Sequence, residues 1–274
     1  MKKSELTLIP IAGLCNRINV LRSAIGLVEH CHNVKIKIYW QKTHDCCANF
    51  EDLFEPISDN ILVGNITMNK LKSIFLIPPY RWTFGLTPKF RKIFFDAEFR
   101  GSTISNDTIE DYFDKFQKLY IYSDNRFCRY STQIPLSDIF HPTSEIEDRI
   151  NNVVKKYTKN TVGVHIRRTD NVASINGSPI EKFYQIMDRE ISENEDTAFY
   201  IASDSELVKS NLKDKYGNRI ITADWELKRN TVKGMKDAVA ELFCLGRTSK
   251  IIGSKASTYS IIASEICNIP LILD

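Results

Sequence analysis

The spacing of hydrophobic residues switches between two periods over the second half of the chain. Short apolar runs that end in polar or turn residues predict strands, and segments with apolar residues three to four positions apart predict helices. The predicted strands cover 161–168, 198–204, 219–223, 250–254 and 271–274. The predicted helices cover 145–157, 179–191, 205–217, 235–248 and 257–267. This alternation predicts a doubly wound parallel sheet of the Rossmann type.

The first half of the chain opens in the same way. A strand over 6–12, a turn at 13–16, a helix over 19–31 and a strand over 35–40 form a β-loop-α-β unit, and the pattern is less regular between 60 and 130. We therefore predict an α/β protein with two halves, divided into residues 1–145 and 146–274.

Composition and charge narrow the class of protein. The 274 residues are 43% hydrophobic and 26% charged, as in globular proteins, and a net charge of +3 does not favour nucleic acid as a partner. No run approaches the ~18 apolar residues that cross a bilayer, and the N-terminus lacks the apolar region of a signal peptide. The seven cysteines form no CxxC motif, which favours reduced thiols in a cytoplasmic protein.

Polar side chains follow three of the predicted strands in the second half. In open parallel sheets, ligands bind outside the carboxyl ends of the strands. The polar residues at these ends are His165, Arg167, Arg168 and Asp170 after one strand, Ser203 and Asp204 after the next, and Ser254, Ser257 and Thr258 after a third. Three such ends together predict a pocket for an anion.

The two arginines of this set have different roles in the prediction. Neighbouring residues of an extended segment point to opposite faces, so Arg167 and Arg168 cannot share one function. The planar fork of one arginine suits a diphosphate, while the other pairs with Asp170 or with a neighbouring element. The alternative is that both are surface charges.

Two loops carry further candidates for phosphate binding. In GSKASTYS (253–260), backbone N–H groups and hydroxyls at the start of a helix suit a phosphate, or Ser257 is a plain helix cap. In GLCNR (13–17), Asn16 either caps the following helix or faces the second half; the loop lacks the GxGxxG spacing.

The stretches GLCNR, HIRRTD, YIASD and IIGSKASTYS together resemble the GDP-fucose-dependent fucosyltransferases, above all the α1,6-type enzymes that act on Nod factors and N-glycan cores, and their bacterial relatives. The resemblance is good over 161–262, thin over 11–27 and absent between. It implies a GT-B fold, in which two Rossmann-like domains face a cleft, with the acceptor on the side of residues 1–145 and GDP-fucose bound by residues 146–274. It also implies inversion at the sugar carbon without a metal.

The resemblance implies roles for the charged residues of the second half. Arg167 grips the β-phosphate and stabilises the charge of the leaving GDP, and His165 helps to hold the nucleotide. Asp170 orders the motif loop, and Asp204 supports the donor site. Glu241 falls where the α1,6 enzymes have an aspartate that binds guanine. Arg167, Asp170 and Asp204 form the predicted catalytic set.

The same resemblance assigns the remaining donor-binding positions. Ser257 and Thr258 match hydroxyls near the phosphates, and Ser254 belongs to the same set. Gly13 and Asn16 match an N-terminal loop that closes on the donor.

The chain departs from the family pattern at three places. Cys15 stands where relatives have glycine, and Asn171 stands where the α1,6 enzymes have lysine. No acid occurs between 172 and 178, where those enzymes place a proposed base. The base is therefore open between Asp170, Glu181 and Asp204.

The sequence predicts no metal and no other cofactor. A metal-dependent transferase usually presents Asp-x-Asp at a strand end, and this sequence contains none. Together with the resemblance, which implies the donor and the inversion, this predicts an inverting, metal-independent glycosyltransferase that moves L-fucose from GDP-fucose to a glycan hydroxyl in bacterial surface polysaccharide or glycoconjugate synthesis. The alternatives are a transferase for another GDP-sugar and a non-catalytic protein that binds nucleotide or glycan.

A basic and aromatic segment lies outside these motifs. No acidic residue occurs over 60–95, while lysines and arginines alternate with aromatic residues. Residues 70–95 predict either a surface that rests on the anionic inner membrane, as a lipid-linked acceptor would require, or a folded core with solvated lysines.

Overall fold

The computed structural model describes residues 4–58, 61–66, 75–78, 90–104, 109–226 and 228–273. The chain forms two compact units: unit 1 contains residues 1–134 and 229–231, and unit 2 contains 135–228 and 232–274. The division falls at 134/135, before the boundary at 145/146 that we expected from the sequence. The reason is that the short helix α4 (Leu136–Ile139) packs on α10 (Thr258–Cys267) of unit 2.

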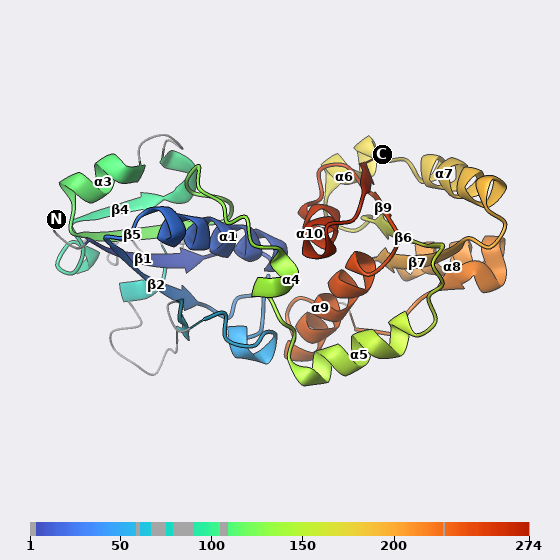
Figure 1. The fold of residues 1–274 in the computed structure, drawn as a ribbon, viewed down its shortest axis with the longest axis horizontal. Coiled ribbons are helices and arrows are strands. Elements are labelled where there is room, and N and C mark those ends of the chain that lie inside the picture. The colour runs from blue at the N-terminus through green and yellow to red at the C-terminus, as the bar shows by residue number, and fades with distance from the viewer. Residues whose placement is uncertain are drawn as a thin grey trace. The chain divides into compact units, whose positions relative to one another are not determined.

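Unit 1 is built on a parallel five-stranded sheet (Figure 1). Its strands, in the spatial order β3-β2-β1-β5-β4, are β3 (Val63–Asn65), β2 (Val34–Trp40), β1 (Ser4–Pro10), β5 (Lys118–Ser123) and β4 (Ala97–Arg100). The longer helices described here are α1 (Leu14–His30) and α3 (Ile109–Lys115). The β-loop-α-β opening predicted from the sequence corresponds to β1, α1 and β2. Glycine is required in α1 at Gly26, because a Cβ there would lie 2.6 Å from the backbone of Ser131.

The segment predicted to contact a membrane lies largely outside the described residues. Two of its basic side chains are described: Lys92 is exposed and Arg91 is fully buried. The Nε of Arg91 lies 2.8 Å from Glu98, and its guanidinium lies 4.8 Å from the centre of the Tyr120 ring. Phe95 packs on an apolar cluster that contains Tyr120. Arg91 and Phe95 therefore belong to the core of unit 1, so at these two positions the structure agrees with the folded-core alternative and not with the membrane-facing one.

Unit 2 contains the second parallel five-stranded sheet. Its strands, in the spatial order β10-β9-β6-β7-β8, are β10 (Leu271–Leu273), β9 (Ile251–Gly253), β6 (Thr161–Ile166), β7 (Ala198–Ser203) and β8 (Ile220–Ile221). The helices besides α4 and α10 are α5 (Ser144–Val154), α6 (Val172–Gly177), α7 (Ile180–Glu193), α8 (Glu206–Tyr216) and α9 (Val232–Gly246). Every strand predicted in this half is present, and α6 is an additional helix.

The central strand β6 presents a different set of side chains to each face of its sheet. Val162, Val164 and Ile166 pack with residues of α7 and α8 in the main apolar cluster of unit 2. Gly163 and His165 face the other side, where Gly163 lies against Leu245 and His165 contacts Ser260 of α10. This alternation follows from the pleat of a strand, and it sets the directions of the residues that follow β6.

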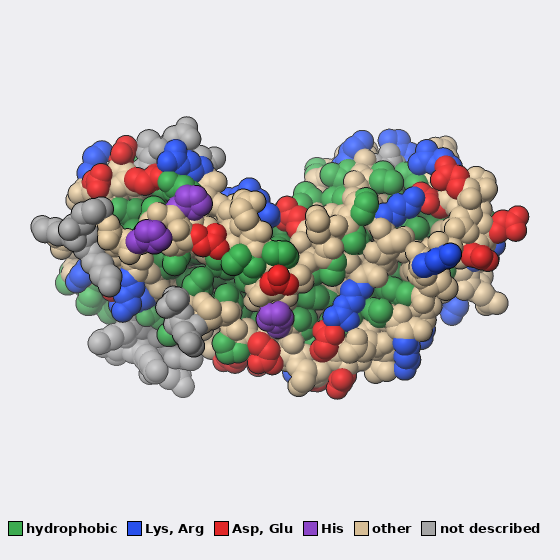
Figure 2. Space-filling view, in the orientation of Figure 1, with side chains coloured by type: hydrophobic (Ala, Val, Ile, Leu, Met, Phe, Trp, Pro, Cys, Tyr) green, Lys and Arg blue, Asp and Glu red, His purple; other side chains and the backbone are tan. Residues whose placement is uncertain are grey.

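Basic and acidic side chains are interspersed over the visible face of unit 2 (Figure 2). Within the described residues, no helix has both the length and the hydropathy that a membrane span requires.

Candidate functional site

The three strands that end in polar residues are neighbours in the sheet of unit 2. Strand β6 lies between β7 and β9, with Ile166 paired to Ser203 and His165 paired to Gly253. The segments that follow these strands, 167–171, 204–205 and 254–257, therefore leave the same edge of the sheet side by side. The structure thus brings together most of the site residues predicted for the second half.

Asp204 connects the end of β7 to the loop that follows β6. Its Oδ1 accepts from the backbone N–H of Arg168 at 2.8 Å, and its Oδ2 accepts from the N–H and the hydroxyl of Thr169 at 3.3 and 2.6 Å. The Nε of Arg167 lies 3.1 Å from the same Oδ2. Four donors thus converge on this carboxylate, and they fix the conformation of the HIRRTD loop. Thr169 is a contact that the sequence analysis missed.

The side chain of Arg167 lies between two carboxylates. One is Asp204, and the other is Asp170, which forms an ion pair with the terminal nitrogen of Arg167. Arg167 is 18% exposed and Asp170 54% exposed, so this pair opens to solvent. The positive charge of Arg167 is therefore partly neutralised by these two carboxylates before an anion binds.

Arg168 is directed to the opposite side of the loop, as the sequence predicts. It donates to the carbonyls of Ser178 at 2.6 Å and of Arg167 at 3.0 Å, and its guanidinium lies 5.8 Å from the centre of the Phe183 ring in α7. Burial lowers the pKa of Arg168 below its usual value. The two arginines therefore have distinct environments, and Arg168 pairs with a neighbouring element and not with Asp170.

His165 lies inside unit 2, beneath α10. It is 4% exposed, its Nδ1 is 2.9 Å from Oγ of Ser260, and its ring centre lies 4.9 Å from that of Tyr259. Burial, followed by the nearby charge of Arg167, lowers the pKa of His165 to about 4. The imidazole is therefore neutral near pH 7 and supports the start of α10.

The loop between β9 and α10 begins at Ser254 and ends at Ser257, and the hydroxyls of these two residues have different environments. The hydroxyl of Ser254 accepts from the backbone N–H of Arg167 at 3.1 Å and donates to the carbonyl of His165 at 3.3 Å, so it joins β9 to β6. Ser257 is the N-cap residue of α10, but its side chain makes no capping hydrogen bond, and it is 7% exposed. The first amides of α10, beginning with Thr258, are thus without a side-chain cap. The alternative that Ser257 is a plain cap is not what the structure shows.

The same loop is held from one side by the segment that contains α6. The amide of Asn171 donates to the carbonyl of Ala256 at 2.9 Å, and the hydroxyl of Ser174 donates to the carbonyl of Lys255 at 2.7 Å. The backbone N–H of Lys255 donates to the hydroxyl of Ser178 at 2.9 Å. Ala256 adopts a left-handed conformation with φ 54°. The sequence analysis missed these contacts, and no local pattern in the sequence signals them.

Glu241 is a nearly buried carboxyl in α9, with 6% exposure. Burial is the main cause that raises its pKa to about 8, and Lys209 opposes this effect. Its carboxyl forms no hydrogen bond or ion pair within the described ranges. A buried group of this kind is available to a ligand that can donate hydrogen bonds to it.

Gly13 and Asn16 lie in unit 1, after β1. Gly13 is the N-cap residue of α1, and Asn16 lies within the first turn, where its amide donates to the carbonyl of Asp124 at 2.8 Å. The alternative in which Asn16 caps α1 is therefore wrong. Cys15, in the first turn of α1, is 6% exposed.

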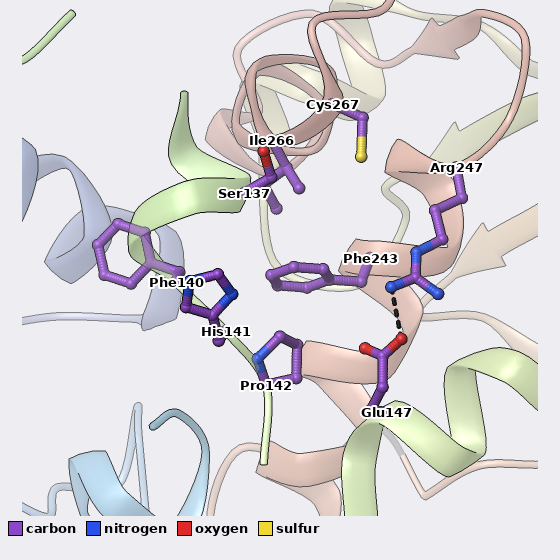
Figure 3. A pocket seen from close by; sticks show the side chains of 9 residues that line it. All are labelled: Ser137, Phe140, His141, Pro142, Glu147, Phe243, Arg247, Ile266 and Cys267. Carbon is purple, nitrogen blue, oxygen red and sulfur yellow. Dashed lines mark hydrogen bonds and ion pairs between the residues drawn. The ribbon is translucent and has the colours of Figure 1, made fainter. Parts of the chain in front are cut away.

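A separate pocket of about 270 Å³ lies elsewhere in unit 2 (Figure 3). Its walls include Phe140, His141, Phe243 and Cys267, and Arg247 and Glu147, which also line it, form an ion pair of 2.6 Å. Cys267 ends α10, whereas the loop described above begins that helix. The segments 167–171, 204–205 and 254–257 together form the strand-end cluster, and the pocket shares no residue with it.

Solved structures of other proteins share this fold over nearly the whole chain, although the sequence matches no protein-family model and no curated protein. The NodZ α-1,6-fucosyltransferase co-crystallised with GDP has a TM-score of 0.64 at 15% identity, over 100% of this chain and 95% of that chain. A mutant of Arabidopsis thaliana FUT1 in complex with GDP has a TM-score of 0.64 at 16% identity, over 99% and 70%. The apo form of POFUT1 has a TM-score of 0.60 at 14% identity, over 100% and 98%.

This chain has the fold of the NodZ fucosyltransferase. The GT-B-like α/β class that we predicted is confirmed, with two parallel sheets of five strands each. The four short motifs resembled fucosyltransferases, and the fold that the chain shares with NodZ confirms this resemblance as far as the fold is concerned. The roles of single residues and the absence of a metal stay predictions. Within the ranges that the structure describes, no three His, Cys, Asp or Glu side chains gather in a group that could hold a metal ion.

Proposed function

We propose that this protein is an inverting, metal-independent glycosyltransferase that moves L-fucose from GDP-fucose to a hydroxyl of a glycan. The observation that carries the proposal is the strand-end cluster of unit 2. There the loop with Arg167 follows β6, and the uncapped start of α10 follows the neighbouring strand β9. The chain that carries this cluster has the fold of NodZ.

The diphosphate of the donor fits this cluster. The first amides of α10 carry the positive end of the helix dipole, and Ser257 and Thr258 add hydroxyls beside them. Arg167 supplies a planar guanidinium at the neighbouring strand end. Together these groups stabilise the charge that develops on GDP as it leaves, which is the role that a divalent ion has in metal-dependent transferases.

The guanine base is assigned to Glu241. A guanine presents its N1–H and 2-amino donors on one edge, and the carboxyl of Glu241 is a buried acceptor without a hydrogen bond among the described residues. A pyrimidine base lacks this pair of donors. The proposal therefore includes a preference for GDP over UDP.

In the transfer step, the acceptor oxygen forms a bond to the anomeric carbon of fucose while the bond from that carbon to the β-phosphate oxygen breaks. The electron pair leaves with GDP, and a base takes the proton of the acceptor hydroxyl. Asp204 already accepts from four donors, which assigns it to holding the loop. Asp170, half exposed beside Arg167, and Glu181, exposed in the first turn of α7, are the remaining candidates for the base.

The cellular setting of the proposal is bacterial surface polysaccharide or glycoconjugate synthesis on the cytoplasmic side of the inner membrane. A lipid-linked acceptor is consistent with the exposed apolar side chains of Phe90, Ile93 and Phe94, which lie beside the exposed Lys92. Flotation with anionic vesicles tests this part, with a Lys92→Ala, Ile93→Ser, Phe94→Ser variant as its comparison. Equal binding by both proteins would end the membrane assignment.

The donor is tested by the thermal shift of the protein with GDP, GDP-fucose, GDP-mannose and UDP, each with and without EDTA. We expect GDP-fucose and GDP to stabilise the protein most, with no effect of EDTA. A stronger effect of GDP-mannose would favour a transferase for another GDP-sugar.

Catalysis is tested by the release of GDP from GDP-fucose in the presence of a panel of glycan acceptors. Release that depends on an acceptor supports the transferase. Tight binding of GDP-fucose with no release of GDP for any acceptor would favour the non-catalytic alternative. The lack of acidic residues in α6 (VASING) is the reason to test this alternative.

A further inference from the structure

The loop after β6 carries little net charge for the task that the proposed function gives it. It contributes Arg167 and Arg168, while Asp170 and Asp204 contribute two carboxylates that contact the loop. Formally, two positive and two negative charges cancel. A diphosphate gains negative charge when the bond to the sugar breaks, so a further cation at this edge would stabilise the leaving group.

Lys255 differs from the two arginines at this edge, because both guanidinium groups are already engaged: Arg167 with two carboxylates and Arg168 with two backbone carbonyls. The segments between β6, β7, β9 and the helices that follow them contain three basic residues, namely Arg167, Arg168 and Lys255. Lys255 is exposed, and its ammonium forms no ion pair or hydrogen bond with any residue that the structure describes. It precedes the uncapped start of α10 by three positions.

The backbone of Lys255 is held on both sides of its Cα. Its N–H donates to Ser178 and its carbonyl accepts from Ser174, both in the segment around α6. The stem of its side chain lies against Gly177, where an added Cβ would be 3.5 Å from the Cβ of Lys255. An exposed lysine in a plain surface turn needs no such support, whereas a cation that must meet a ligand at one place benefits from it.

We propose that Lys255 binds the diphosphate of the nucleotide donor as a second cation beside Arg167, and that Ser174 and Ser178 position it. In the transfer step, the electron pair of the breaking carbon–oxygen bond goes to the β-phosphate, and the Lys255 ammonium stabilises that oxygen without giving up its proton. This inference rests on the proposed function, because it assigns a further residue to the same donor site.

The test measures binding of GDP, GMP and guanosine by isothermal titration calorimetry to the full-length protein and to variants. Lys255→Ala should weaken GDP binding about tenfold, the loss typical of one charge-assisted hydrogen bond, with a smaller loss for GMP and none for guanosine. Lys255→Arg should retain most of the GDP affinity. Lys213→Ala, which removes an exposed lysine from α8, is the matched control and should bind like the unsubstituted protein.

The positioning part is tested by a double-mutant cycle. Ser174→Ala should weaken GDP binding more than guanosine binding, and it should have no further effect when Lys255 is already alanine. A purely structural role of Ser174 would instead affect GDP and guanosine alike and persist in the Lys255→Ala background.

The outcomes separate this inference from the function on which it rests. If the unsubstituted protein does not bind GDP, the proposed function fails and the inference fails with it. If that protein binds GDP and Lys255→Ala binds it equally well, only the role of Lys255 is overturned. Lys255→Gln, with circular dichroism of each variant, excludes misfolding as the cause of a loss.

Discussion

The Oδ1 of Asp204 lies 2.8 Å from the backbone nitrogen of Arg168 and accepts its hydrogen bond. Asp204 follows β7 and Arg168 follows the neighbouring strand β6. The side chain at the end of one strand therefore holds the backbone at the end of the other. The alternation of the extended chain directs Arg167 and Arg168 to opposite sides, and this hydrogen bond holds the backbone of Arg168 in that conformation. The conformation of the arginine pair is thus supported by a carboxylate 36 positions away in the sequence.

Asp204→Ala should destabilise unit 2 and reduce transfer together. Removal of the carboxylate leaves the N–H groups of Arg168 and Thr169 without their acceptor, at a cost of about 1–3 kcal/mol. Urea unfolding and GDP release measure the two effects. The exposed Asp214→Ala in α8 is the control and should match the unsubstituted protein. An unchanged unfolding midpoint for Asp204→Ala would rule out its role in holding the loop.

Substitutions of the two adjacent arginines should affect different properties, the transfer rate for Arg167 and the stability for Arg168. Arg167→Ala should lower the transfer rate about 10²- to 10³-fold with little loss of stability, because its side chain stabilises the leaving diphosphate. Arg168→Ala should mainly lower the melting temperature, because its guanidinium donates to two backbone carbonyls and packs near Phe183. Near-normal turnover by a folded Arg167→Ala protein would refute the assignment.

GDP binding should depend on pH through Glu241. Its pKa of about 8 means that the carboxyl is largely protonated at pH 7, and guanine donors favour the ionised form. Binding should therefore release a proton, and the affinity should rise by up to about tenfold per unit as pH increases towards 8 and level off above it. Calorimetry in buffers of different ionisation enthalpy counts the proton. Glu241→Gln should bind more weakly and without this pH dependence; a retained dependence would assign it to another group.

Stability should fall in acid through His165. The folded pKa is about 4, below the ordinary value of 6.5, so the neutral form is favoured in the folded state. The resulting stability is fully present above pH 6.5 and is lost as pH falls towards 4, by up to about 1.4 kcal/mol per unit. Urea unfolding at several pH values should show a shallower slope for His165→Gln. The exposed His32→Gln should keep the slope of the unsubstituted protein.

Alanine substitutions of Arg91 and of its neighbour Lys92 should have very different effects on the free energy of unfolding. Arg91→Ala leaves the partly buried Glu98 without its partner and should cost about 3–5 kcal/mol in the free energy of unfolding. Lys92→Ala removes an exposed side chain and should change that free energy by less than about 0.5 kcal/mol. Equal effects in urea unfolding would mean that the buried ion pair does not contribute as the structure indicates.

The periodicity of the chain was sufficient to predict the sheet of unit 2 and the directions of its central residues. The alternation of Val162, Gly163 and Val164 places them on different faces, and the same parity separates Arg167 from Arg168. Contacts between distant segments were not predictable in this way. Nothing local in the sequence shows that Ser174 and Ser178 bond to the backbone of Lys255, or that Asp204 accepts from Thr169.

The site was harder to predict where a residue type fits two environments. Ser257 has the identity of a helix cap, yet its hydroxyl makes no capping bond. Arg91 has the identity of a surface cation, yet it is fully buried against Tyr120. In both cases the tertiary neighbours decide the outcome, and a single sequence does not contain them explicitly.

The hydrogen bonds that join Asn171, Ser174 and Ser178 to the loop between β9 and α10 limit how this site can be engineered or can diverge. A transplant of that loop alone into another transferase of this fold would leave its backbone groups without their donors and acceptor. The segment 171–178 would have to be exchanged with it. In this protein, two stretches about 80 positions apart thus form a single exchangeable module.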